Sequence, residues 1–325
     1  MSRTKGNIVR VVYVGNFGPE HSTENHVARA LTNNGHDVVT MQESGLDWAS
    51  VAYFAAADAA ADLFMWTRTA GFDPADLTTQ HETIEALRRH GIPTVGYHLD
   101  RWWGLNREPD IHRSPFFRVD LLVTADGGHD QEWAEAGVNH LWMPPAISRD
   151  EAVRGTFNPA YACDVGFVGN LIGYGHPEWA PYRQSLFNHL NRRYRGRFRV
   201  FPGQGKPAIR GKALQDLYAS VRVVVGDSCL AGGVERYWSD RVPETLGRGG
   251  NLIHPWVEGI GDAHPYLAKW ELGDWAGLSE EIEIGLAESD DQREAYIVRN
   301  RDHTLEHHTY ERRMADLMDR VKELK

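Results

Sequence analysis

The sequence predicts an α/β protein of two Rossmann-like, doubly wound domains that face each other across a cleft. Three observations point to this class: short apolar runs alternate with helical segments, Pro144-Pro145 interrupts the alternation, and a second series of the same kind follows. Strands that are apolar on both faces are typical of a parallel sheet covered by helices on each side. With 325 residues, 42% of them hydrophobic, the chain is long enough to bury two cores.

The first half alternates between strands and helices up to the proline pair. The expected strands are the short β-rich runs at 8–14, 37–41, 62–67, 94–99, 120–125 and 140–143. After the first of them, a helix is expected from Ser22 or Thr23 to Asn34-Gly35, because hydroxyl residues cap helix starts and glycine ends helices. A second helix is expected over 79–90.

The second half repeats the pattern after a polar linker. The first domain is placed at 1–150, the second at 151–300, and a C-terminal helical segment at 301–325, packing near the domain junction. The expected strands are 164–169, 198–201, 221–226 and 251–254. The expected helices are 181–194, 212–219, one beginning at Ser239 or Asp240, 279–287, 290–299 and 309–323.

Composition excludes several protein classes. No apolar run reaches the roughly 18 residues of a membrane span. The apolar stretch near the N-terminus is too short for a signal peptide, and we interpret it as a strand. Cys163 and Cys229 form neither a metal-ligand pattern nor a disulfide framework, and no HExxH motif is present. We therefore expect a cytoplasmic protein without a metal.

The segment SDRVPETLGRGG (239–250) carries the clearest chemistry. Ser239 or Asp240 suits a helix N-cap, and the free amides of a first turn attract anions. Arg241 adds a permanent cation, and Glu244, about one turn further, would accept hydrogen bonds from a ribose diol. These residues predict a pocket for a nucleoside diphosphate, and the plainer alternative is a capped helix with a surface Arg–Glu pair.

The second half resembles the donor domain of two-domain (GT-B) glycosyltransferases, in particular the family 4-like, spore-maturation-protein-like group. The matching segments follow the family's order and are DVGFVGN (164–170), LYASVRVVVGDS (217–228), SDRVPETLGRGGNLI (239–253) and HTYERRMADLM (308–318). The resemblance implies that Glu244 holds the ribose of the donor nucleotide. It also implies that Arg241, with Ser239 and Asp240, holds the diphosphate.

Two further donor contacts are implied by the same resemblance. The turn after the first strand of the donor domain, at Gly169-Asn170, would let the backbone approach the nucleotide. Many members of the family carry two glutamates separated by seven residues, the first of which contacts the donor sugar. This chain has Arg236 at that position and Glu235 beside it, so the backbone amides of Gly232-Gly233 are the alternative contact.

The first half is expected to bind the acceptor. Glu20 and His21 lie in the first loop and could touch the reacting hydroxyl, although a polar loop whose next residues cap a helix is an equal alternative. Asp126 and His129 follow another strand and are further candidates. Ligands of doubly wound sheets bind at the carboxyl ends of the strands, where all these residues fall.

The segment GYHLDRWWGL (96–105) is also placed at a strand end. His98, Asp100 and Arg101 would leave the strand toward the ligand. Trp102-Trp103 could form a stacking wall for a sugar or a base. The alternative is a core histidine and a loop anchored in the core by its tryptophans.

Charge is unevenly distributed along the chain. The formal net charge is -10, yet 179–215 contains no acid and nine basic residues. They are Arg183, Arg192, Arg193, Arg195, Arg197, Arg199, Lys206, Arg210 and Lys212. A solvated surface is the ordinary interpretation of such a segment, and a platform for a polyanion is the sharper one. With the tryptophans at 102–103 this suggests duplex DNA as acceptor, modified at a hydroxymethylated base flipped from its stack.

Together these features predict a glycosyltransferase that moves a sugar, with glucose as the best guess, from a nucleotide diphosphate sugar such as UDP-glucose to an acceptor hydroxyl. No DxD pair stands at a strand end, so no metal or other cofactor is expected. The family resemblance implies retention, whereas inversion would need a base such as Asp100, His98 or Glu20. A sugar-nucleotide 2-epimerase and a non-catalytic nucleotide-sugar-binding protein are the alternatives, and neither would need an acceptor site.

Overall fold

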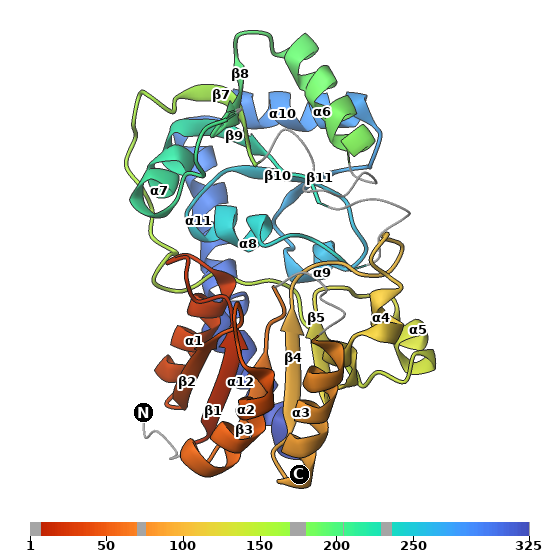
Figure 1. Cartoon of the computed structure of the whole chain (residues 1–325). Coiled ribbons are helices and arrows are strands. Elements are labelled where there is room, and N and C mark those ends of the chain that lie inside the picture. Colours follow the sequence, from red (N-terminus) through yellow and green to blue (C-terminus); the bar gives the residue numbers. More distant parts are fainter. Residues whose placement is uncertain (1–7, 70–75, 170–179, 204, 229–235, 325) are drawn as a thin grey trace. The chain divides into compact units, whose positions relative to one another are not determined.

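The computed structural model describes residues 8–69, 76–169, 180–203, 205–228 and 236–324, and the chain divides into two compact units (Figure 1). The first unit comprises Met1–Trp103, Arg107–Met143 and Tyr310–Lys325. The second comprises Gly104–Asn106 and Pro144–Thr309. The chain thus passes into the second unit after Met143, seven residues before the expected boundary at 150, and its last helix belongs to the first unit.

The described part of the first unit contains a six-stranded parallel sheet in the order β2-β1-β3-β4-β5-β6. Its strands are β1 Arg10–Gly15, β2 Asp37–Gln42, β3 Leu63–Trp66, β4 Thr94–His98, β5 Leu121–Thr124 and β6 His140–Trp142. Each lies within one residue or two of an expected strand. The central strands β3 and β5 are buried along their whole length, which explains why they lack polar alternation.

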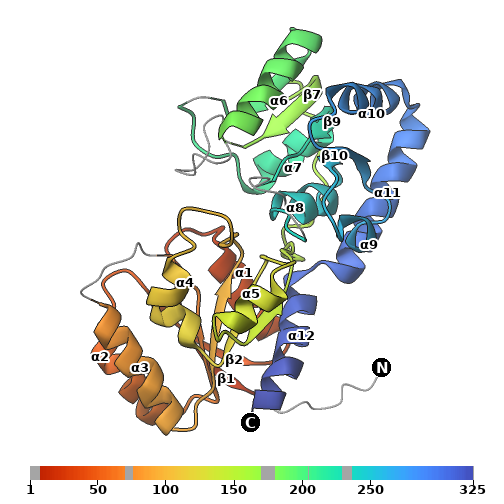
Figure 2. The same ribbon diagram turned by 90° about the vertical axis from the view of Figure 1, so that its right-hand side faces the viewer.

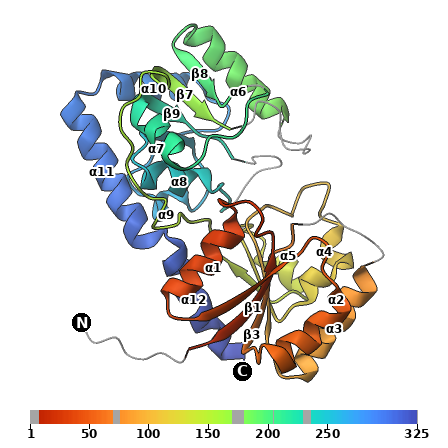
Figure 3. The ribbon, with the colours of Figure 1, turned by 60° about the vertical axis from the view of Figure 1, so that its left-hand side comes forward.

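Helices flank this sheet on both sides (Figure 3). They are α1 Thr23–Asn33, α2 Trp48–Tyr53, α3 Leu77–Arg89, α4 Asp110–Arg113, α5 Asp130–Glu135 and α12 Tyr310–Val321. Ser22 caps α1, since its side chain accepts a hydrogen bond from the backbone N–H of Asn25 at 3.2 Å. The short helices α2, α4 and α5 were not expected, because segments of four to six residues carry too little helical periodicity to recognise.

The C-terminal helix α12 packs against α1. Its buried residues Met314, Leu317, Met318 and Val321 have the spacing of one helix face. The side chain of Asn34, at the end of α1, donates a hydrogen bond to the carbonyl of Glu311 at 2.8 Å. An apolar stripe and this cap contact therefore hold the end of the chain on the first unit.

The described part of the second unit holds a five-stranded parallel sheet in the order β11-β10-β9-β7-β8. Its strands are β7 Cys163–Val168, β8 Phe198–Phe201, β9 Val221–Val225, β10 Leu252–Pro255 and β11 Ala268–Trp270. Its helices are α6 Ala180–Arg193, α7 Gly211–Ser220, α8 Arg241–Gly247, α9 Ile260–Ala263, α10 Trp275–Ala287 and α11 Asp290–His307. Figure 2 shows α7 and α8 on the side of the strands away from α6 and α10.

One hydrophobic core joins α6 and α10 to the second sheet, through Phe167, Phe187, Val223, Leu278 and Ile282 among others. The predicted doubly wound α/β architecture of both halves is thereby confirmed. β7 and β9 are parallel neighbours, so their carboxyl ends deliver the following residues to one place. Within the described residues, no helix has the length and apolar character needed to cross a membrane.

Candidate functional site

A cluster of charged side chains lies at the carboxyl ends of β7 and β9 in the second unit. Gly169 directly follows β7, and Asp227 lies two residues after β9. Arg183 lies on α6, and Arg241 is the first residue of α8. Asp227 is 1% exposed and accepts hydrogen bonds from Arg183 at 2.7 and 3.2 Å. A third bond reaches it from the Nη1 of Arg241 at 3.4 Å. We call these three residues the Arg–Asp–Arg cluster.

The Arg–Asp–Arg cluster contains two cations and one carboxylate. Two guanidinium groups share one carboxylate, and both lie 5.7 Å from the centre of the Phe167 ring. Burial lowers the pKa of Arg241, but the charges of Asp227 and Asp240 outweigh it, and the net shift is upward. Arg241 therefore stays charged, and its side chain is 21% exposed. Such a site suits an anion with oxygen acceptors.

The backbone conformation and close neighbours of Gly169 favour glycine at this position. Its φ is +151°, which side-chain-bearing residues rarely adopt. A Cβ at this position would lie 3.0 Å from both the Nη2 of Arg241 and a ring carbon of Phe167. The missing side chain thus leaves room for the guanidinium, in addition to the backbone approach that the family resemblance implied.

Glu244 follows Arg241 on α8, in a half-buried position where its side chain is 26% exposed. Burial, followed by the nearby charge of Asp240, raises the pKa of its carboxyl group. Arg248 opposes this shift from 4.0 Å, and its guanidinium also donates to the Glu244 carbonyl and to Glu151. Glu244 therefore lies one helical turn from the cationic cluster, with Arg248 supporting its ionised form.

The start of α8 is not capped as the sequence suggested. Asp240 occupies the N-cap position, but it has helical backbone angles and its side chain makes no capping hydrogen bond. The backbone N–H of Ser239 instead donates to the Ser228 hydroxyl at 3.1 Å. Since α8 has only seven residues, the cations contribute more charge here than the helix end does.

A buried hydrogen-bonded chain fixes this turn. The Nδ1–H of His254 donates to the Pro255 carbonyl at 2.8 Å, so its Nε2 is the acceptor that faces the Ser228 hydroxyl at 3.2 Å. Burial lowers the pKa of His254 to about 4, so the ring is neutral at pH 7. His254 and Ser228 therefore orient the first residues of α8. Sequence reasoning missed them, together with Arg183 and Asp227.

Several predicted donor contacts lie outside the described residues. They are Asn170, Gly232, Gly233 and Glu235.

In the first unit, His98 ends β4, where it was expected. Its Nδ1 accepts a hydrogen bond from the backbone N–H of Asp100 at 3.1 Å, which leaves the ring hydrogen on Nε2. Burial lowers the pKa of His98 to about 4. Asp100 is 55% exposed and forms an ion pair with Arg107 at 3.2 Å. A neutral His98 and an exposed Asp100 thus stand together at the end of this strand.

Trp102 and Trp103 do not form the predicted stacking wall. They are 4% and 9% exposed and belong to the core of the first unit, and the Arg101 side chain is also buried. The Oδ2 of Asp126 accepts hydrogen bonds from the backbone N–H groups of Trp102 and Trp103, at 2.7 and 2.8 Å. The tryptophans therefore anchor this loop, and Asp126 holds its backbone.

The other candidates of the first unit lie near its surface. His129 is 22% exposed and lies 4.0 Å from Asp126 and 3.5 Å from Glu132. Glu20 is exposed and His21 half-buried, both in the loop after β1. The role of Glu20 and His21 at an acceptor stays a prediction.

Four of the nine basic residues of the segment form ion pairs with carboxylates. Arg183 pairs with Asp227, Arg193 with Glu283 at 3.8 Å, Arg197 with Asp164 at 2.5 Å, and Lys212 with Asp216 at 2.5 Å. Arg192 and Arg193 are exposed at the end of α6, and Lys212 lies on α7, on the other side of the sheet. Within the part of the chain described, no group of three or more His, Cys, Asp or Glu could hold a metal ion.

Part of the second unit is similar to a known family. Residues 183–319 match a family described as glycosyl transferase-like, and this range contains Arg183, Asp227, Arg241 and Glu244. The more specific spore-maturation group is not identified by this match. A search of curated proteins finds no match to the chain.

Several solved structures share the fold over nearly the whole chain. A trehalose-6-phosphate synthase studied for glycosyl transfer with retention has a TM-score of 0.63 at 10% identity, covering 97% of this chain and 99% of its own. An E. coli structure of the trehalose-6-phosphate group, bound with UDP-2-fluoro glucose, has a TM-score of 0.61 at 11% identity, covering 95% and 98%. A UDP-forming synthase from Burkholderia vietnamiensis has a TM-score of 0.59 at 12% identity, covering 98% and 99%. The predicted GT-B fold is confirmed.

Proposed function

We propose that this chain, a glycosyltransferase of the GT-B type, transfers a sugar from UDP-glucose or a close analogue to an acceptor hydroxyl with retention of configuration. The observation that carries the proposal is the pair of guanidinium groups sharing one buried carboxylate beside a glycine at the carboxyl ends of β7 and β9. The donor and the retention are supported by analogy with the similar structures, one of which holds UDP-2-fluoro glucose.

Arg241 and Arg183 would stabilise the leaving group. As the bond from the anomeric carbon to the diphosphate breaks, its electron pair moves onto the diphosphate oxygen and negative charge grows there. Cations already in position stabilise that charge without reorganising. Asp227 holds both guanidinium groups in place, and the charge of Asp240 also acts on Arg241. The site therefore responds most strongly to the charge that develops during transfer.

Glu244 would bind the ribose of the donor. An ionised carboxylate can accept hydrogen bonds from both hydroxyl groups of a ribose, which a neutral side chain of the same size cannot do. Its distance of one turn from Arg241 suits a nucleoside whose diphosphate is held by the Arg–Asp–Arg cluster. Nearby Arg248 favours the ionised form that this role requires.

We assign His98 to acceptor positioning. Its low pKa and the hydrogen bond accepted by Nδ1 make it a poor base and leave Nε2–H as a donor to a sugar or other hydroxyl. Asp100, exposed beside it and paired with Arg107, would accept a hydrogen bond from an acceptor hydroxyl and help to orient it. With retention, the diphosphate oxygen that leaves the donor can take the proton of the reacting hydroxyl, so no carboxylate base is needed. Duplex DNA as acceptor stays a prediction, and the ion pairs of the basic segment weigh against it.

Incubation of the full chain with UDP-glucose and no acceptor tests the proposal. A transferase should release UDP and glucose slowly, and Arg241→Ala should abolish this release while Arg192→Ala, an exposed control on α6, should not. Epimerised sugar would indicate the epimerase instead. Binding of UDP-glucose with no turnover, also in the presence of a panel of hydroxyl acceptors, would indicate a non-catalytic binding protein.

A further inference from the structure

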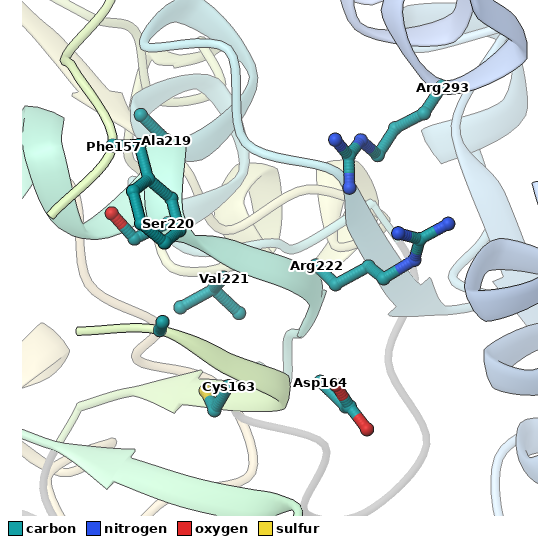
Figure 4. Close-up of a pocket in the computed structure, with 9 residues that line it drawn as sticks. Phe157, Cys163, Asp164, Ala219, Ser220, Val221, Arg222 and Arg293 are labelled. Carbon is teal, nitrogen blue, oxygen red and sulfur yellow. The ribbon is translucent and has the colours of Figure 1, made fainter. Parts of the chain in front are cut away.

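A second pocket lies at the opposite edge of the second sheet, where the strands begin (Figure 4). Its volume is about 430 Å³, which falls in the range of small-molecule sites. The residues that line it are Phe157, Ala162, Cys163, Asp164, Ala219, Ser220, Val221, Arg222 and Arg293. We call it the amino-edge pocket, because Cys163 and Val221 are the first residues of β7 and β9.

The amino-edge pocket is separate from the Arg–Asp–Arg cluster. Cys163 pairs with Val221 across the two strands, whereas Asp227 and Gly169 lie beyond the far ends of the same strands. Strands of this length span roughly 15–20 Å. A ligand in this pocket therefore could not contact the proposed diphosphate site, so its presence does not depend on the proposed function.

The two sides of the amino-edge pocket differ in character. Figure 4 shows the guanidinium groups of Arg222 and Arg293 on one side and the ring of Phe157 on the other. Phe157 is 67% exposed, so its ring offers apolar surface to a ligand in the pocket. An apolar surface facing two cations is complementary to a ligand that has an apolar body and a negative head.

The cations that line the pocket outnumber the carboxylates that line it. Arg222 and Arg293 lie 3.9 and 3.2 Å from Asp290, whose side chain is 84% exposed. An ion pair so open to water competes poorly with a ligand anion. The charge of Glu288 also acts on both arginines, but neither Asp290 nor Glu288 is among the residues that line the pocket. Asp164, on the remaining wall, is already engaged by Arg197 at 2.5 Å. Two cations therefore line the pocket against one lining carboxylate that is already paired.

The framework around the pocket is fixed before any ligand binds. The Ser220 hydroxyl accepts a hydrogen bond from the backbone N–H of Asn158 at 2.7 Å and donates to the Asp216 carbonyl at 2.6 Å. The Arg222 guanidinium donates to the Glu288 carbonyl at 2.6 Å. These bonds hold the segment carrying Phe157 and one cation in position, which reduces the ordering that a ligand would impose.

We propose that the amino-edge pocket binds a small organic anion whose apolar body packs on Phe157 and whose phosphate or carboxylate group pairs with Arg222 and Arg293. Phenyl phosphate is a suitable probe, and inorganic phosphate is the matched probe without an apolar body. Both are titrated calorimetrically into the full chain, with and without saturating UDP. Phenyl phosphate should bind in either case, and about tenfold more tightly than inorganic phosphate, since burying a ring adds hydrophobic free energy.

Variants separate the two halves of the pocket. Arg293→Gln should weaken both probes about tenfold, the effect of losing a charged hydrogen bond. Phe157→Ser should weaken phenyl phosphate and leave inorganic phosphate unchanged. Arg192→Gln, an exposed control outside the pocket, should alter neither. Both probed residues are partly or largely exposed, so the variants should fold.

Cys163 reports the location directly, because its side chain lines the pocket. Phenyl phosphate should slow alkylation of Cys163 by N-ethylmaleimide, measured by peptide mass spectrometry, in the parent protein but not in Arg293→Gln. Displacement of the probe by UDP, equal affinity for both phosphates, or unchanged alkylation of Cys163 at saturating probe would each overturn the proposal. So would the absence of binding at millimolar concentrations of phenyl phosphate.

Discussion

Replacing Arg241 and Arg183 by alanine should have different effects, because their settings differ. Arg183 is 6% exposed and makes two hydrogen bonds to Asp227, while Arg241 is 21% exposed and makes one, at 3.4 Å. Arg241→Ala leaves the tighter pair intact, so its free energy of unfolding should change little. Arg183→Ala strips the buried carboxylate of its better partner and should cost about 3–5 kcal/mol of stability.

Donor affinity should follow a different order. Arg241→Ala removes a charged hydrogen bond to the diphosphate, worth about 1.5–3 kcal/mol, which corresponds to a 10- to 150-fold weaker affinity for UDP. The affinity for uridine should be nearly unchanged, because uridine has no phosphate.

Calorimetry with UDP and uridine, together with urea denaturation, measures both effects, and Arg192→Ala serves as the exposed control. Unchanged affinity of Arg241→Ala for UDP, or an equal loss for UDP and uridine, would refute the phosphate assignment.

Four further outcomes are expected. Gly169→Ala should weaken UDP binding, because its Cβ would lie 3.0 Å from the Arg241 guanidinium. Gly166→Ala on β7 is the control, since its Cβ would crowd Val221 and not Arg241. UDP affinity should fall on acidification, and the fall should begin above pH 4.5, the ordinary pKa of a glutamate, because the pKa of Glu244 is raised. Glu244→Gln should make UDP affinity less dependent on pH. This variant should also be more stable to unfolding at pH 7, since burial disfavours the charge of Glu244. His98→Ala should fold and bind UDP yet lose transfer, whereas a lowered melting temperature with full turnover would indicate a packing role. If duplex DNA is the acceptor, the logarithm of its affinity should fall with the logarithm of the salt concentration, with a slope of roughly -0.9 per phosphate contact. A gel-shift series across salt concentrations measures this slope. Serine in place of Arg192, Arg193, Arg195 and Arg197 should make it less steep.

Much of the fold could be predicted because its signals are local. The strands of both sheets are short apolar runs, and Ser22 precedes its helix as a cap should. β11 was not expected, since Lys269 interrupts its three residues and leaves no apolar run. The helix α11 continues to His307 instead of ending near residue 299, because its polar surface gives no signal for the buried positions that extend it.

The site could be predicted only where its residues are adjacent in the sequence. Arg241 and Glu244 lie on one short helix and share a turn. Arg183 was interpreted as part of a basic segment, because its partner Asp227 is 44 residues away and only the parallel pairing of β7 and β9 brings them together. Trp102 and Trp103 follow a strand end, as ligand-binding residues do, but whether they face a ligand or the core depends on packing.

A crystal structure of the full chain with UDP-glucose or a non-hydrolysable analogue would show where the donor binds. The diphosphate should lie within about 3 Å of Arg241 and Arg183, and the ribose hydroxyl groups should contact the Glu244 carboxylate. A nucleotide bound elsewhere, or a diphosphate that contacts neither arginine, would contradict the proposed donor site.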